Sequence, residues 1–265
     1  MEIAGYIASL LIGISLGLIG GGGSILTVPV MVYLFGLQPI LATSYSLFIV
    51  GSASLVGAFK NARRGQVNKR AVMVFGITSI LVVFITRKFL LPAIPKNLFT
   101  INGFTITGSL LIMLLFAILM LVASISMIRT HMVVTGTNDR ETHSHTGQLT
   151  LYGIFIGLVT GLLGAGGGFL LIPVLVLLLK LPMKSAIGTS LSIIALNSLI
   201  GFTGDLGHYS IDWKFLIIIT GIAIAGIFMG SQLSKKIEGE KLKKGFGWFV
   251  LIMGIYIIVK ETILK

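Results

Sequence analysis

Long runs of apolar residues alternate with short polar breaks along almost the whole chain. A helix needs about 20 consecutive apolar residues to cross a bilayer. The pattern contains ten apolar segments, and the third, fourth, fifth, eighth, ninth and tenth are long enough to cross. The ten segments are residues 3–19, 24–36, 40–59, 71–91, 103–128, 149–164, 168–180, 185–203, 213–234 and 245–264. The pattern therefore predicts an all-α polytopic membrane protein in which the four short segments form two pairs.

The chain divides into two halves that resemble each other. Residues 17–29 align with residues 161–173 at an offset of 144, and seven of these thirteen positions are identical. The Thr-Ser-x-Ser pattern at 43–46 recurs at 189–192, at an offset of 146. Two matches in the same order predict an internal duplication. The expected division is a first membrane repeat at 1–128, a cytoplasmic linker loop at 129–148 and a second membrane repeat at 149–265.

The basic loops predict the orientation of the two repeats in the membrane. Each half has five segments, an odd number, so the second half starts on the opposite side of the membrane and the repeats are inverted. With both termini outside, the cytoplasmic loops hold fourteen Lys and Arg residues and the outer loops hold six. The positive-inside rule favours this orientation in the plasma membrane of the cell. The number of full crossings lies between six and ten, depending on whether the short pairs cross or re-enter.

The amino-acid composition excludes several classes of function for this protein. Hydrophobic residues make up 55% of the chain and charged residues 11%, which excludes an ordinary soluble domain. The net charge of +12 is explained by basic loops on a membrane protein rather than by a nucleic-acid partner. The absence of cysteine excludes disulfides and thiolate metal sites. We expect the lipid bilayer and a small anion as partners, no cofactor and no metal, and either a monomer or a homodimer.

Glycine clusters interrupt both short pairs, and paired interruptions in inverted repeats are typical of a binding site near the membrane midplane. Helices that begin at Ser24 and Gly168 would direct free N–H groups toward the breaks, which suits an anion. The alternative is that the glycines serve close helix packing. The candidate substrate-binding residues in the breaks are Gly20, Gly21, Gly22, Gly23, Ser24, Gly164, Gly166, Gly167 and Gly168.

Hydroxyl side chains near the starts of two long segments extend this candidate site. Hydroxyl groups there can donate hydrogen bonds to an oxyanion, or they can cap helix N–H groups. Asn197 follows seven residues after Ser190, on the same helical face, and its alternative role is a hydrogen bond between helices. The further candidate substrate-binding residues are Thr43, Ser44, Ser46, Thr189, Ser190, Ser192 and Asn197.

Charged residues are absent from the centres of the expected spans. This disfavours a cation pump, which needs carboxylates inside the membrane, and suits a small anion. Asp205 and His208 lie near the expected outer mouth, where they could carry a proton or be ordinary loop residues. An integral membrane enzyme is disfavoured because catalytic groups at membrane depth are missing.

The paired glycine motifs, the Thr-Ser motifs, the duplication and the length together resemble the TauE/SafE sulfite exporter family, also called the 4-toluene sulfonate uptake permease group. The resemblance implies a secondary transporter of small sulfur-containing anions, such as sulfite, thiosulfate or organosulfonates. We expect alternating access, with export as the direction. The alternatives are an anion channel and a transporter of another small organic anion.

Overall fold

The computed structural model describes residues 2–95, 97–101, 104–129, 146–233 and 239–262. The first half contains α1 (Glu2–Ile19), the 3-10 helix η1 (Gly22–Leu26), α2 (Thr27–Tyr33), α3 (Pro39–Arg63), α4 (Lys69–Ile85), the π-helix η2 (Thr86–Leu90), β1 (Asn97–Ile101), β2 (Phe104–Thr107) and α5 (Gly108–Arg129). The second half contains α6 (Thr146–Leu163), α7 (Gly168–Leu177), α8 (Met183–Asp205), α9 (Trp213–Leu233) and α10 (Gly239–Thr262). The expected linker lies largely outside the described residues.

The helices confirm a polytopic membrane protein. Five helices in the described part of the chain are long and apolar enough to cross a membrane, namely Pro39–Arg63, Lys69–Leu90, Gly108–Ile128, Met183–Asp205 and Trp213–Leu233. The sixth segment expected to be long enough, 245–264, lies in α10 and in residues beyond it. Many large apolar side chains face outward, such as Ile77 at 59% and Ile217 at 61% exposure. Lipid tails solvate such side chains, whereas water does not.

One boundary differs from the sequence-based expectation. The apolar segment expected as a helix over 103–128 is preceded and partly replaced by an antiparallel hairpin of β1 and β2, and α5 begins only at Gly108. The Thr107 hydroxyl accepts a hydrogen bond from the backbone N–H of Leu110 at 3.2 Å, which caps the helix there. The alternation of Thr with Phe and Ile just before this cap favours a strand.

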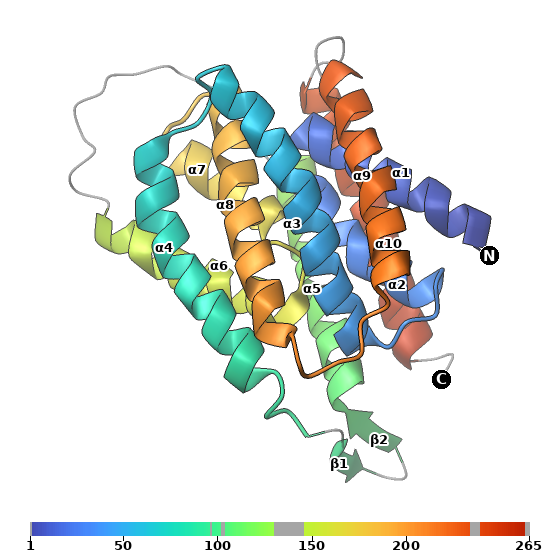
Figure 1. Cartoon of the computed structure of the whole chain (residues 1–265). Coiled ribbons are helices and arrows are strands. Elements are labelled where there is room, and N and C mark those ends of the chain that lie inside the picture. Colours follow the sequence, from blue (N-terminus) through green and yellow to red (C-terminus); the bar gives the residue numbers. More distant parts are fainter. Residues whose placement is uncertain (1, 96, 102–103, 130–145, 234–238, 263–265) are drawn as a thin grey trace.

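The two halves pack against each other in a reciprocal pattern. α3 and α8 lie side by side in the centre of the bundle, with α4 beside α8 and α9 beside α3 (Figure 1). α1 packs on α9, and α6 packs on α4. In chain order, α1, α3 and α4 of the first half correspond to α6, α8 and α9 of the second half. Exchanging the halves therefore turns the α4–α8 contact into the α9–α3 contact, and the α1–α9 contact into the α6–α4 contact. This reciprocity is what a duplicated chain produces, and the inverted orientation in the membrane stays a prediction.

Small residues allow the outer helices to approach closely. A Cβ on Gly17 of α1 would lie 2.9 Å from the backbone nitrogen of Ser231 in α9. At the equivalent position of the second half, a Cβ on Gly161 of α6 would lie 2.7 Å from the Cβ of Thr86. The glycines of α1 and α6 therefore serve helix packing. The contact at Gly161 also fixes the position of η2, the turn that carries the principal side chain of the candidate site.

Candidate functional site

The structure brings the two glycine breaks into direct contact. A Cβ on Gly21 would lie 2.6 Å from the carbonyl oxygen of Gly168, and a Cβ on Gly168 would lie 2.6 Å from that of Gly21. Only residues without a side chain allow the two breaks to approach this closely. Both breaks are buried, and Gly164, Gly166 and Gly167 each have a φ of +66°, which favours glycine.

The start of the first broken helix differs from the expectation. η1 begins at Gly22 rather than Ser24, and Gly22 and Gly23 belong to it. Ser24 lies inside this turn, and its hydroxyl donates to the carbonyl of Gly21 at 2.7 Å. Gly20 precedes the turn with a φ of +82°. The second broken helix, α7, begins at Gly168 as expected.

Neither Thr-Ser motif caps a helix, so the capping alternative is wrong. α3 begins at Pro39 and α8 at Met183, several residues before the motifs. The hydroxyls instead bond carbonyl oxygens of their own helices, or groups of the opposite half. Bonds within a helix join Thr43 and Ser44 to Ile40, Ser190 to Ile187 and Ser192 to Gly188.

Two of these hydroxyls connect the halves of the chain. The Ser46 hydroxyl donates to the carbonyl oxygen of Gly164 at 2.8 Å. The Thr189 hydroxyl accepts from the backbone N–H of Asn68 at 2.9 Å. Ser46 therefore ties α3 directly to the second glycine break, which the sequence pattern did not indicate.

A buried ion pair lies next to this break. Arg87 is 0% exposed and Asp205 is 1% exposed, and Nη1 of Arg87 lies 3.1 Å from Oδ2 of Asp205. Arg87 lies near the end of the expected fourth segment, 71–91, where no sequence pattern indicated a buried charge. Here η2 continues α4 through a wide turn, in which the N–H of Leu91 donates to the Thr86 carbonyl at 2.8 Å. Asp205 is the last residue of α8, so its interpretation as an ordinary loop residue is wrong.

His208 differs from Asp205 in its surroundings. His208 lies in the exposed turn after α8, and its backbone N–H donates to the Asp205 carbonyl at 3.1 Å. The described structure therefore separates the two candidates for proton coupling. One is a buried carboxylate paired with a cation, and the other is a surface imidazole.

Arg87 keeps most of its hydrogen-bonding capacity unused. Nη1 donates to the Thr43 hydroxyl at 2.9 Å and to Asp205. Nε and Nη2 of Arg87 have no hydrogen-bond partner among the described residues, and neither has Oδ1 of Asp205. A guanidinium carries five N–H groups, and a buried unpaired donor costs about 1–3 kcal/mol. The unused Nε–Nη2 edge is a fork that matches two oxygens of an oxyanion.

The Nη2 atom lies against the second glycine break. A Cβ on Gly164 would lie 2.7 Å from Nη2 of Arg87 and 2.6 Å from the Cβ of Thr43. Only a residue without a side chain therefore allows the break to pack this closely against Nη2. Gly201 and Gly204 similarly allow η2 to lie close to α8. A Cβ on Gly204 would lie 3.1 Å from the Cβ of Arg87.

A second group of buried polar atoms surrounds Gly166 and Gly167. The Asn197 side chain accepts a hydrogen bond from the Ser79 hydroxyl at 3.0 Å, so it bonds between helices. The Asn197 amide nitrogen and the hydroxyls of Ser198 and Thr160 have no partner among the described residues. Ser198 lies against Gly166, and Thr160 lies against Gly167. Ser198 of α8 and Thr160 of α6 therefore place unpaired buried hydroxyls beside the second glycine break.

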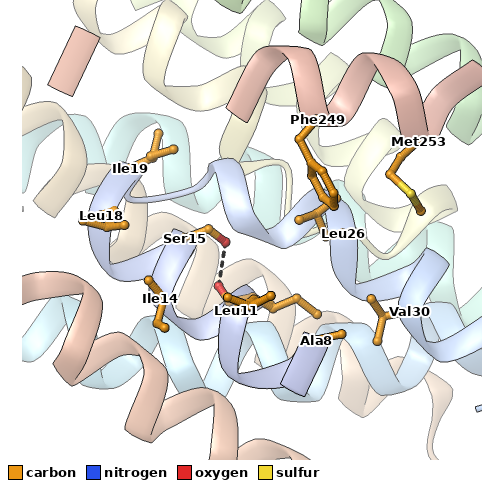
Figure 2. Close-up of a pocket in the computed structure, with 11 residues that line it drawn as sticks. Ala8, Leu11, Ile14, Ser15, Leu18, Ile19, Leu26, Val30, Phe249 and Met253 are labelled. Atoms are coloured by element: carbon orange, nitrogen blue, oxygen red, sulfur yellow. Dashed lines mark hydrogen bonds between the residues drawn. The ribbon is translucent and has the colours of Figure 1, made fainter. Parts of the chain in front are cut away.

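The main apolar cavity is separate from these groups. It has a volume of about 290 Å³ and lies between α1, the η1–α2 segment and α10 (Figure 2). Its lining is apolar apart from Ser15, whose hydroxyl bonds the Ile12 carbonyl at 2.8 Å. This cavity offers no group that would bind an anion. A smaller cavity of about 20 Å³ adjoins Gly22 and Pro173 and has room for about one water molecule.

Metal ligands do not gather in the described part of the chain, where no group of three or more His, Cys, Asp or Glu residues could hold an ion. The central-loop histidines at 131, 143 and 145 lie outside the described residues.

The helices thus define a multi-pass α-helical membrane protein with a buried charge pair and two buried glycine breaks. Comparison with known proteins places it among membrane transporters. The family model "Sulfite exporter TauE/SafE" matches residues 6–257, and the chain belongs to this family. No solved structure shows a significant match.

Three relatives illustrate the similarity. A "Probable membrane transporter protein" of Xylella fastidiosa (strain 9a5c) is 29% identical over 94% of this chain and 91% of its own length. The "Probable membrane transporter protein MJ0441" of Methanocaldococcus jannaschii is 26% identical over 96% of this chain and 94% of its own. The "Probable membrane transporter protein YunE" of Bacillus subtilis is 25% identical over 91% and 89%.

Proposed function

We propose that this membrane transporter carries small sulfur-containing anions, such as sulfite or an organosulfonate, by alternating access. The observation that supports the proposal most directly is the unpaired Nε–Nη2 edge of the buried Arg87 side chain. A sulfite or sulfonate group presents two or three oxygens at a spacing that can accept both N–H groups at once. Gly164 lies against Nη2 and has no side chain, so no Cβ covers this edge of the guanidinium.

The remaining polar groups provide a route from this position. Thr160, Asn197 and Ser198 offer hydroxyl and amide donors around Gly166 and Gly167. Hydroxyl and amide groups bind an oxyanion without adding charge, so the anion can leave them again. The N-terminus of α7 at Gly168 adds a positive dipole end at the same break.

The burial of the site favours a transporter over a channel. Arg87, Thr43 and both glycine breaks are buried, so the described structure offers the site no aqueous opening. An anion can reach Arg87 only after the packed halves move, and such a movement is the basis of alternating access. A channel with the same groups would need a continuous water-filled pore.

We propose export as the direction, driven by the outward concentration gradient of the substrate. Export and uptake use the same site, so this part of the proposal rests on the family description rather than on the geometry.

Flux of labelled sulfite through liposomes that contain the purified protein tests the proposal. We expect saturable flux that sulfonates inhibit and that chloride does not. The Arg87→Lys variant keeps the positive charge but loses the forked pair of donors. Two charge-assisted hydrogen bonds are worth about 3 kcal/mol or more, so sulfite flux at low concentration should fall by about 100-fold.

Lys88→Ala is the matched control. Lys88 is the next residue and is exposed, and its Nζ lies 5.4 Å from the centre of the Phe84 ring. Flux through this variant should equal that of the wild-type protein. Equal flux through Arg87→Lys and Lys88→Ala would contradict the assigned site, and the absence of sulfite flux in the inserted wild-type protein would contradict the substrate class.

A further inference from the structure

The pair of Arg87 and Asp205 is joined by one contact only. Nη1 meets Oδ2 at 3.1 Å, and Oδ1 of Asp205 makes no hydrogen bond in the described structure. The same Nη1 atom also donates to the Thr43 hydroxyl at 2.9 Å, so Arg87 is held in place independently of the carboxylate. Asp205 can therefore change its charge without releasing the guanidinium from Thr43.

The charges at this site must balance because the site is buried. Arg87 and Asp205 together carry no net charge. An anion bound at the Nε–Nη2 edge adds one negative charge to a region from which water is excluded. Isolated charges are costly in such surroundings, and a protein reduces the cost by pairing or by binding a proton. A proton on the carboxylate restores neutrality, because the anion then becomes the counter-ion of Arg87.

We propose that Asp205 binds one proton each time Arg87 binds a substrate anion, so that one proton crosses the membrane with each anion. This inference rests on the proposed function, because it assumes that Arg87 binds the substrate. The proton comes from water at the face where α8 ends, binds Oδ1 or Oδ2 of Asp205 and leaves with the anion. No covalent bond is made or broken in the anion.

The groups that face Asp205 support its role as the proton-binding residue. Besides Arg87, these groups are the Ser44 hydroxyl, His208 and Tyr209. His208 is exposed to solvent, which weakens its electrostatic effect on the buried carboxylate. Burial and the Asp205 carboxylate raise the pKa of Tyr209, so this phenol stays neutral at physiological pH. Asp205 is the last residue of α8 and is directly followed by the exposed Leu206, so the buried carboxylate lies where the chain reaches the surface.

The inference has a measurable electrical consequence. The site is neutral without substrate, and it is neutral again with an anion and a proton bound. If a monovalent anion crosses with one proton, the membrane potential neither drives nor opposes the movement. A pH gradient acts on the coupled movement instead, by about tenfold in accumulation for each pH unit, in addition to the concentration gradient of the substrate.

Replacing Asp205 by asparagine tests this consequence. The asparagine side chain cannot gain or lose the proton, so each anion crosses alone and carries its full charge. The measurement is the charge moved per labelled sulfite ion, obtained from accumulation at known potentials set by potassium and valinomycin. The Asp205→Asn variant should move one more negative charge per sulfite than the wild-type protein. That extra charge changes the accumulation by about 50-fold for a potential of 100 mV.

The comparison is independent of how sulfite itself is protonated, because both proteins receive the same substrate at the same pH. Asp212→Asn is the matched control. Asp212 is an exposed aspartate seven residues further on, and its carboxylate accepts from the Phe215 N–H at 3.0 Å. Asparagine can make the same cap. We expect this variant to move the same charge per sulfite as the wild-type protein.

The outcomes separate this inference from the proposed function. Sulfite flux with equal charge in the wild-type protein and Asp205→Asn would overturn the coupling and leave the transporter intact. No sulfite flux in the wild-type protein would overturn the function itself. If Asp205→Asn does not insert, proton uptake on sulfite binding decides the question in lightly buffered detergent solution. The wild-type protein should take up about one proton for each sulfite that it binds, and binding without proton uptake would overturn the coupling.

Discussion

Replacing Gly164 by alanine tests how closely the glycine break and the arginine depend on each other. The new Cβ would lie 2.7 Å from Nη2 of Arg87 and 2.6 Å from the Cβ of Thr43, and it would also meet the Thr43 carbonyl oxygen. The φ of +66° at Gly164 adds a backbone cost of about 1–2 kcal/mol for any residue with a side chain. Forcing an extra methyl group into a packed core typically costs about 1–3 kcal/mol more.

The free energy of unfolding should therefore fall by about 2–5 kcal/mol. Denaturation of the purified protein in detergent measures this change. Sulfite flux should fall by more than the loss of folded protein explains, because the methyl group occupies the space beside Nη2.

Gly221→Ala is the control for this substitution. Gly221 lies on the exposed side of α9, and a Cβ there would meet nothing within 4 Å. Alanine inside a helix is favoured over glycine by about 1 kcal/mol, so this variant should be as stable as the wild-type protein or more stable. Equal stability and equal sulfite flux in Gly164→Ala and Gly221→Ala would refute the close packing of the break against Arg87.

Three further substitutions extend the test. Gly166→Val places a side chain at a φ of +66° within a buried break. This variant should abolish sulfite flux in protein that still reaches the membrane. Normal flux would show that the substrate does not pass this break. Ser79→Ala leaves the Asn197 side chain without the donor at 3.0 Å and should lower the free energy of unfolding by about 1–3 kcal/mol in a denaturation assay. Ser46→Ala removes the 2.8 Å hydrogen bond to the Gly164 carbonyl and should lower the free energy of unfolding by about 1 kcal/mol in the same assay. An unchanged free energy of unfolding in either alanine variant would show that its hydrogen bond does not stabilise the fold.

The sequence indicated the general architecture because the relevant signals are local or repeated. The apolar runs predicted the long helices, with most boundaries within a few residues. The glycine clusters matched each other at a fixed offset, so a shared location for the two breaks could be expected before their contact was known. The close approach of Gly21 to Gly168 agrees with that expectation.

Arg87 was missed because two adjacent basic residues near the end of the segment 71–91 gave no sign that one of them is buried. Arg87 and Lys88 lie next to each other at the end of an apolar run, where basic residues usually mark a loop. The wide turn of η2 carries the two side chains to different surroundings, since Arg87 is buried and Lys88 is exposed. A useful signal was present in the helical spacing, because Ser79, Val83 and Arg87 follow one another at intervals of four.

The pairing of Arg87 with Asp205 depends on tertiary contacts that no local pattern contains. The two residues are 118 positions apart, and their helices approach because Gly201 and Gly204 have no side chains. Asp205 was expected near the outer mouth, but nothing in the sequence indicated Arg87 as its partner. The hydrogen bonds of the Thr-Ser motifs were similarly unpredictable, because a buried hydroxyl can bond its own helix or a neighbour.

Binding of sulfite to the purified protein tests the role of Arg87 most directly. A ligand that binds only the folded protein stabilises it by about 2.7 kcal/mol at 100 times its dissociation constant. The chain has no cysteine, so sulfite cannot act through disulfide cleavage. We predict that sulfite raises the denaturation midpoint of the wild-type protein and of Lys88→Ala, and leaves that of Arg87→Lys nearly unchanged. Equal stabilisation of all three proteins by sulfite would contradict the assignment of Arg87 as the anion-binding residue.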